Sequence, residues 1–225
     1  MPRRTETVVA RRAGVLSARW RAVAVLLAAM MLCNPLQTGA SAMPAGRVAI
    51  WQLDAARSEV HFELRALGVI GISGRVVKVQ GEVWRDAKGA WVQVRVPLSA
   101  LRMSSERRRS WALSEEFFDA ARHPELVFTA ALPAEARVDR LRGELRGTLN
   151  LRGIDGPVSI DLAPQDCADD EAVCKVQAYA EVSRRRFGMT TRRMTLSDVV
   201  KLDLRLQLKK SPDAAPKPTS RRRRG

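Results

Sequence analysis

The sequence predicts an all-β protein, an antiparallel barrel of about eight strands with one short helical insert. Segments in which apolar and polar residues alternate recur along the chain, as in strands that bury one face. Most of these segments are joined by short turns, a pattern typical of an antiparallel sandwich or a closed barrel. One stretch, residues 99–122, interrupts the alternation and carries helical signals.

The strands of the first half are predicted from their alternation. In the first strand, Val60, Phe62 and Leu64 share one face, and glycine-punctuated residues 67–74 form the turn that follows. The strand after this turn has β character up to Trp84, and the next one repeats valine at every second position. The predicted strands here cover residues 57–65, 76–84 and 92–96.

The strands of the second half follow the same rule. Leu126 and Phe128 lie two residues apart, and residues 152–157 are a predicted turn between two further strands. The last strand is the most regular, with leucine at every second position from 202 to 208. The predicted strands here cover residues 125–130, 141–151, 158–162, 176–182 and 199–208.

The insert begins with a basic helical turn. Ser104 or Ser105 can cap it, and it starts at Glu106 and continues through three arginines. The arginines Arg107–Arg109 and Arg122 would flank a cavity mouth, where they could contact a pyrophosphate or an anionic lipid head group. The alternative is an ordinary solvated helix face, because exposed ion contacts contribute little.

A second helix is expected directly afterwards, with Ser114 as its cap. Acidic residues follow Ser114, where the helix dipole favours them, and Phe117 and Phe118 give the helix an apolar face. Pro124 ends the helix, so the two phenylalanines fold back towards the next strand. Such a helix is either a lid on a barrel or the closure of an ordinary filled core.

The two ends of the chain do not belong to the predicted fold. Residues 1–42 carry six arginines before an apolar run at 22–33 and end in Ala-Ser-Ala, which predicts a secretory signal peptide cleaved after Ala42. Arg11 and Arg12 raise twin-arginine export as a variant, although the residues after them match that signal poorly. Residues 211–225 are proline- and arginine-rich and are expected to form a disordered basic tail. The domain is thus expected over residues 43–210 of an exported, periplasmic protein.

Charge and cysteine content narrow the possible partners. The whole chain carries a formal charge of +15, much of it near the termini, which favours an anionic membrane surface without requiring a specific nucleic acid. After cleavage only Cys167 and Cys174 remain, and two cysteines in an oxidising compartment predict a disulfide. Metal binding is the alternative, but the chain has only two histidines and no Cys-x-x-Cys.

The sequence contains no recognisable catalytic constellation. His61 lies on the opposite strand face from Phe62, and His123 lacks a partner at catalytic spacing beyond Glu125. Triad, P-loop and dinucleotide motifs are missing from the sequence, so no catalytic residue, metal site or cofactor is assigned. Nothing in the sequence specifies an oligomeric state.

A binding cavity is the candidate site. Its predicted lining follows from strand phase and helix face, although from periodicity alone the same side chains could fill a core. The predicted lining residues are Phe62, Leu64, Val94, Val96, Phe117, Phe118, Phe128, Leu149, Ile160 and Leu204.

Six motifs in order resemble one family of exported bacterial proteins. They are Ser-Glu-Val-His-Phe at 58–62 with the glycine turns after it, Phe-Phe-Asp-Ala-Ala-Arg-His-Pro at 117–124 with Val-Phe at 127–128, Gly-Thr-Leu-Asn-Leu-Arg-Gly-Ile at 147–154, Pro-Val at 157–158, Ser-Arg-Arg-Arg-Phe-Gly-Met at 183–189 and Ser-Asp-Val-Val at 197–200. Over residues 51–208 the chain resembles the YceI-like, polyisoprenoid-binding family. The resemblance implies a lipocalin-like antiparallel barrel with a long apolar cavity for a polyisoprenoid chain, such as a quinone tail or a prenyl pyrophosphate.

Two functions from different classes follow. The first is a non-enzymatic, exported carrier or reservoir of an isoprenoid lipid. The second is a filled barrel that acts as an electrostatic adaptor, whose basic helix and tail dock on anionic membrane, lipopolysaccharide or nucleic acid. A continuous apolar tunnel would favour the carrier, and a packed interior would favour the adaptor.

Overall fold

The computed structural model describes residues 47–133, 136–168 and 172–212. Within these ranges the chain forms twelve strands, and the α-helix there is a single one, α2 (Glu106–Leu113). The strands are β1 (Val48–Leu53), β2 (Glu59–Ala66), β3 (Ile70–Val77), β4 (Gln80–Asp86), β5 (Gly89–Pro97), β6 (Leu101–Met103), β7 (Glu125–Leu132), β8 (Gly143–Leu151), β9 (Ile154–Leu162), β10 (Asp166–Cys167), β11 (Val173–Ser183) and β12 (Val199–Lys210). Three 3₁₀ helices complete the described chain, η1 (Leu98–Ala100), η2 (Val138–Arg140) and η3 (Arg184–Phe187).

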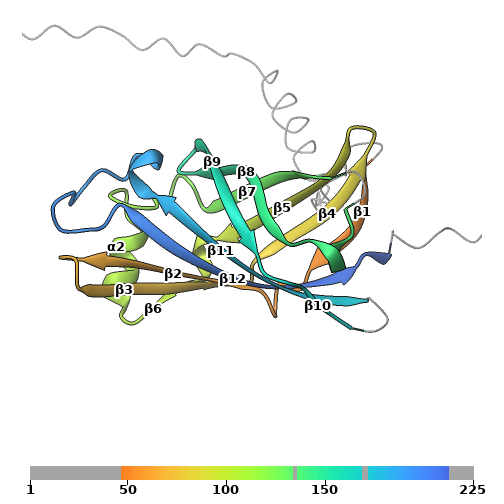
Figure 1. Cartoon of the computed structure of the whole chain (residues 1–225). Helices are drawn as coiled ribbons and strands as arrows, with labels where there is room; N and C mark the ends of the chain where they lie inside the picture. The colour runs from red at the N-terminus through yellow and green to blue at the C-terminus, as the bar shows by residue number, and fades with distance from the viewer. Residues whose placement is uncertain (1–46, 134–135, 169–171, 213–225) are drawn as a thin grey trace, which may run out of the picture. The chain divides into compact units, whose positions relative to one another are not determined.

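Eight strands close into an antiparallel barrel, as the sequence predicts (Figure 1). The ring runs β11–β9–β8–β7–β5–β4–β1–β12 and returns to β11. Every pairing in it is antiparallel, so alternate side chains of each strand point into the barrel. The interior is therefore built from the apolar phase of each strand.

β12 closes the ring because it pairs along one whole edge with β11 and divides its other edge between two strands. Lys210 and Leu208 pair with β1, whereas residues 201–205 pair with β2. β2 then continues into β3 and β6, so one end of the barrel has β1 in its wall and the other end has β2, β3 and β6. The chain itself bridges this second end, because β5 runs through η1 into β6.

The helical insert differs from its prediction in one place. α2 begins as expected, with the Ser105 hydroxyl accepting a hydrogen bond from the Arg108 amide at 3.3 Å. The prediction of a second helix was wrong. Ser114 ends α2 instead of starting a helix, and its hydroxyl donates to the Trp111 carbonyl at 2.7 Å. The residues after Ser114 form consecutive turns, with Asp119 in the left-handed region at φ 52°. A serine can serve either helix end, and here the carbonyls of α2 take its hydrogen bond.

Three other boundaries also differ from prediction. Residues 67–74 are not all turn, because the turn covers only 67–69 and β3 begins at Ile70. Residues 76–84 are not one strand, because Lys78, at φ 61°, turns the chain between β3 and β4. Residues 152–157 are not all turn, because Arg152 and Gly153 alone make a two-residue hairpin with φ of 57° and 71°. β1 was missed because apolar residues occupy both of its faces. Lys78 lacks the glycine or proline signal on which turn prediction rests, whereas Gly156 and Pro157 carry that signal inside β9.

The expected disulfide is present. Cys167 on β10 and Cys174 on β11 face each other in register and are bonded, and Cys174 is fully buried. The domain also extends past its predicted end, since Ser211 is buried and its amide donates to the Ile50 carbonyl at 3.0 Å. The signal peptide predicted at 1–42 and most of the tail predicted at 211–225 lie outside the described residues.

Candidate functional site: an apolar cavity in the barrel

The barrel encloses a cavity of about 150 Å³. Its walls are apolar side chains, with one arginine discussed below. All ten residues of the predicted lining surround this one cavity: Phe62 and Leu64 from β2, Val94 and Val96 from β5, Phe117 and Phe118 from the turns after α2, Phe128 from β7, Leu149 from β8, Ile160 from β9 and Leu204 from β12. Sequence alternation therefore identified a true set of neighbours.

Two phenylalanine rings in the wall lie against glycines of the neighbouring strand. A Cβ atom on Gly147 would come within 2.4 Å of the Phe128 ring, and one on Gly74 within 2.6 Å of the Phe62 ring. Phe62 also meets Phe118 edge-to-face, with ring centroids 6.2 Å apart. Glycine in these strands thus makes room for aromatic side chains inside the barrel.

A second, smaller apolar cavity of about 70 Å³ lies in the part of the barrel nearer β1. The two cavities share four lining residues, Val94, Phe128, Ile160 and Leu204. These four side chains, here called the dividing layer, separate the upper cavity of about 150 Å³ from the lower one. The interior is therefore neither a continuous tunnel nor a filled core, but two cavities divided by one layer of side chains.

The upper cavity has its mouth at the β2–β3–β6 end. Lining side chains from the deeper strands, such as Leu149 and Ile160, are buried. Those at the mouth are only half-buried, among them Leu64, Ile72, Met103, Trp111 and Phe118. The exposure of the lining thus increases from the dividing layer towards α2 and the β2–β3 hairpin.

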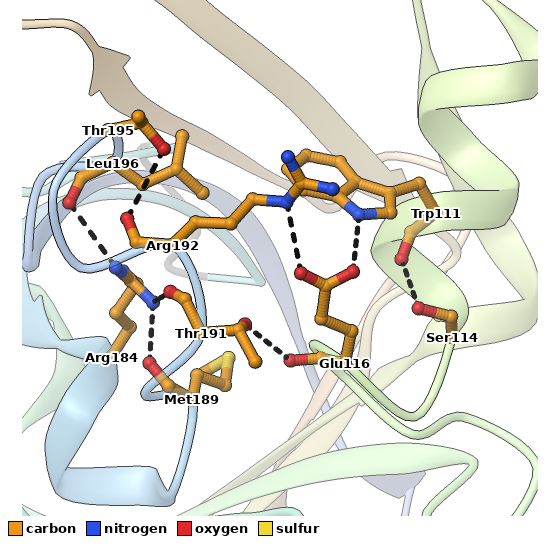
Figure 2. A network of polar contacts seen from close by, with 9 residues as sticks. All are labelled: Trp111, Ser114, Glu116, Arg184, Met189, Thr191, Arg192, Thr195 and Leu196. Atoms are coloured by element: carbon orange, nitrogen blue, oxygen red, sulfur yellow. Dashed lines mark hydrogen bonds and ion pairs between the residues drawn. The ribbon is translucent and has the colours of Figure 1, made fainter.

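A polar network holds the turns after α2 against the connection between η3 and β12 (Figure 2). Glu116 is its centre: its carboxylate accepts from the Trp111 indole at 2.9 Å and from the Arg192 guanidinium at 3.0 Å. The Thr191 hydroxyl donates to the Glu116 backbone carbonyl at 3.3 Å. The indole hydrogen bond, together with Arg192, lowers the Glu116 pKa against the opposing effect of burial. Two segments far apart in the sequence are thereby joined beside the mouth.

Arg184 anchors the same connection from inside, and sequence reasoning missed it. Its side chain is 2% exposed and lies in the cavity wall. The guanidinium donates to the backbone carbonyls of Ser197, Met189, Thr191 and Leu196, at 2.9, 2.5, 2.9 and 3.2 Å. Burial lowers the Arg184 pKa. Because four of its five N–H groups are engaged by carbonyls, Arg184 positions the connection rather than presenting a charge to the cavity.

Asp198 fixes the start of β12 next to Arg184. Burial alone would raise the Asp198 pKa, but hydrogen bonds from the Arg185 guanidinium, the Ser183 hydroxyl and the Arg185 amide lower it to about 2. The distances to these partners are 3.0, 2.7 and 3.0 Å. The ionised carboxylate is therefore a structural acceptor that ties η3 to β12.

None of the four predicted head-group arginines lines either cavity. Arg109 donates to the Leu101 carbonyl at 2.8 Å and pairs with Glu106, so it fastens α2 to β6. Arg122 pairs with Glu115 and Asp119 in the turns. Arg107 and Arg108 are exposed, and Arg108 donates to the Ser104 hydroxyl. The basic run is therefore occupied mainly in holding the insert together.

The histidines have structural partners. His61 Nε2 lies 2.8 Å from Glu59 Oε1, in an open outer groove whose lining shares Phe62, Met103 and Leu202 with the upper cavity. His123 Nε2 lies 4.0 Å from Asp119 Oδ2. The described part of the chain has no group of three or more metal-ligating side chains. None of the helices described is both long and apolar enough to cross a bilayer.

An eight-stranded antiparallel barrel with apolar internal cavities is typical of the class of lipocalin-like barrels. Within that class, the chain belongs to the YceI-like domain family, whose pattern matches residues 51–208. No curated protein matches the sequence closely enough to add to this assignment.

Solved structures share the fold at low sequence identity. A polyisoprenoid-binding domain from Saccharophagus degradans, implicated in plant cell wall breakdown, is 15% identical, with a TM-score of 0.58 over 72% of this chain and 99% of that one. BcnA of Burkholderia cenocepacia is 17% identical, with a TM-score of 0.54 over 69% and 98% of the two chains. A mutant Campylobacter jejuni YceI protein is 18% identical, with a TM-score of 0.51 over 64% and 88%. At these identities the likeness shows the fold alone.

Proposed function

We propose that the protein binds an isoprenoid lipid chain inside the barrel and serves as its exported carrier or reservoir. The observation that carries this proposal is a cavity enclosed by the barrel whose lining is apolar except for Arg184. Membership of the YceI-like family and the polyisoprenoid-binding relative from Saccharophagus degradans support an isoprenoid as the ligand class. The role is binding rather than catalysis, and export rests on residues 1–42, outside the described chain.

The size of the cavities bears on how a chain is accommodated. A dry apolar cavity of about 150 Å³ holds a ligand about the size of benzene, so the upper cavity takes one end of a prenyl chain and a longer stretch must displace the dividing layer. Each isoprene unit of five carbons contributes about 4 kcal/mol on burial. Because association itself costs about 4–15 kcal/mol, a few buried units are needed for micromolar affinity.

The prenyl chain of the ligand, and not its head group, should dominate the binding affinity. The only charged side chain in the upper wall is Arg184, and carbonyls of its own loop occupy it. A quinone and a prenyl phosphate with the same tail are therefore expected to bind with similar affinity, and lengthening the tail should strengthen binding.

The proposal is tested by titrating fluorescent prenyl analogues of increasing length into the protein starting at residue 43. Leu149→Trp fills the upper cavity, so we expect roughly tenfold weaker binding with the fold retained. Tyr179→Trp is the matched control, because Tyr179 is 46% exposed on the outer face of β11 and should leave binding unchanged. Absence of saturable binding by the unmodified protein, or equal binding by both variants, would contradict the carrier function.

The adaptor function requires a packed interior, and the two cavities weigh against it. Mass spectrometry of lipid that copurifies with the protein from its native membrane fraction distinguishes the two functions. A carrier should retain a stoichiometric isoprenoid, whereas an adaptor should carry none.

A further inference from the structure

Four large apolar side chains are exposed together at the mouth end of the barrel. Leu67 and Val69 belong to the turn between β2 and β3, and Ile70 is the first residue of β3. Met194 belongs to the connection between η3 and β12. Their exposed fractions are 63, 81, 50 and 95%. We call these four residues the apolar tip. Figure 1 shows the hairpin and the connection at the same end of the barrel.

The apolar tip is one surface because backbone hydrogen bonds join its two segments. The Leu67 amide donates to the Thr195 carbonyl at 2.7 Å, next to Met194. Ala66 bridges Leu196, and the Ser197 amide donates to the Arg65 carbonyl at 2.8 Å. Arg184 holds the same connection from the cavity side, because its guanidinium donates to four of the backbone carbonyls there. The exposed side chains therefore stand on an ordered platform.

Leu67 is at odds with its local environment in two ways. With Gly68 it forms a two-residue turn at φ 50° and 76°, closed by the Val69 amide to the Ala66 carbonyl at 3.1 Å. The first position of such a turn favours asparagine, aspartate or glycine, because a leucine there crowds its own backbone. The Leu67 side chain gains no burial in compensation. A residue that breaks both rules at once points to a use outside the fold.

The charge around the apolar tip is mainly positive. Residues 64–73 and 189–197 contain Arg65, Arg192 and Arg193 and no aspartate or glutamate. Two carboxylates lie at its border: Glu63, exposed on β2 with its Oε1 beside Gly71, and Glu116, which pairs with Arg192 from the turns after α2. Exposed apolar side chains beside arginines are suited to a bilayer interface, where the former enter the acyl boundary and the latter meet anionic head groups.

We propose that the apolar tip docks the barrel on an anionic lipid bilayer with the cavity mouth facing the membrane. Leu64 and Ile72, which line the upper cavity, lie directly behind the tip on the same two strands. A prenyl chain leaving the bilayer would then reach the cavity without crossing water, an orientation that rests on the proposed function. The last described residues follow the far end of β12. A strand of twelve residues is about 40 Å long, so these residues lie about that far from the start of β12 beside the tip.

The test is cosedimentation with vesicles of phosphatidylglycerol and phosphatidylcholine, using protein 43–212 so that the tail makes no contribution. Val69→Ser/Met194→Ser should weaken vesicle binding by about tenfold while the melting temperature is retained, because both side chains are exposed. Val48→Ser/Tyr179→Ser is the matched control, with two exposed apolar residues elsewhere, and should bind like the unmodified protein. Arg65→Gln/Arg193→Gln should lose binding to the anionic vesicles and not to pure phosphatidylcholine.

The same samples separate this inference from the proposed function. Prenyl-analogue titration in solution should be unchanged in Val69→Ser/Met194→Ser, because neither residue lines a cavity. Vesicle binding that is indifferent to the tip variant overturns the docking surface even if prenyl binding is normal. A dimer in light scattering that the tip variant dissociates would assign the tip to a second copy of the chain instead. Tip-dependent vesicle binding without prenyl binding would leave the docking surface standing and remove the carrier.

Discussion

At the scale of single residues, the barrel interior uses two kinds of phenylalanine. Phe128 belongs to the dividing layer and has a cavity on each side. Phe187 is fully buried, lies against Gly156 and lines neither cavity. The two rings have the same size and differ in how much of their surface is supported by neighbouring atoms. That difference should be measurable.

Phe187→Ala should lower the free energy of unfolding by about 3–5 kcal/mol, as in a filled core. Phe128→Ala should cost less, because part of its surface already faces empty space. It should also merge the two cavities and shift the preference towards longer or bulkier prenyl chains. Urea unfolding and prenyl titration of both variants check this. Equal destabilisation, with no change in chain preference, would show that Phe128 behaves as ordinary core.

Asp198 provides a pH-dependent contribution. Its pKa falls from 3.8 to about 2 on folding, so its ionised form stabilises the native state fully above about pH 4, and this contribution is lost as the pH falls towards 2. Asp198→Asn should therefore cost on the order of 1–2 kcal/mol near pH 6 and nothing near pH 2. Unfolding curves of the variant and the unmodified protein, measured from pH 6 to pH 2, should converge. Asp161→Asn, on the exposed face of β9, is the control, and a constant gap for Asp198→Asn across this range would contradict the assignment.

At the scale of elements, alternation predicted the strands well and the ends of elements poorly. Eight of the ten predicted lining residues meet at one cavity because strand phase is a local property that survives folding. Phe117 and Phe118 reach the same cavity from turns, not from the predicted helix. The role of Arg184 could not be read in the same way. It stands among Arg185 and Arg186 like one member of an exposed basic run, and its carbonyl partners come from a connection that only the folded barrel places around it. The C-terminal end of α2 likewise depended on the backbone carbonyl to which the Ser114 hydroxyl donates.

The β10–β11 hairpin depends on its disulfide. Replacing both Cys167 and Cys174 with alanine removes a short covalent loop and should lower the free energy of unfolding by about 2–3 kcal/mol. Prenyl binding should persist, because neither cysteine lines a cavity. Thiol labelling of unreduced protein 43–225, after unfolding, should find no free cysteine. Two labelled thiols in the natively exported protein would show that the bond does not form.

At the scale of the whole molecule, the described barrel has its cavity mouth at one end and the start of the basic tail at the other. The cavities, the dividing layer and the mouth follow one another along the barrel from β1 towards the β2–β3 hairpin. The sequence predicted this barrel, but it could not predict the two-cavity interior. The gaps between side chains depend on how neighbouring strands stagger.

Deleting residues 213–225 should shift the melting temperature by less than about 2 °C. The deleted stretch contains no Val, Ile, Leu, Met or aromatic residue, and the deletion keeps Ser211, whose amide bonds to Ile50. It should weaken binding to anionic vesicles at low salt through the loss of five basic residues. Deletion from residue 209 is the comparison and should destabilise the fold, because Lys209 and Lys210 pair with β1. A large drop in melting temperature for the shorter deletion would place the tail within the domain.

The position of β12 in the chain decides when the barrel can close. It is the last strand to be synthesised, yet it joins β1, β2 and β11. Until residues 199–210 have left the ribosome, each of those three strands keeps an open edge, and the contacts that close the ring span almost the whole domain. Closure thus follows the synthesis of β12, the last strand of the described residues. A chain that terminates within β12 would have unpaired edges on β1, β2 and β11 and an open interior, rather than a smaller closed barrel.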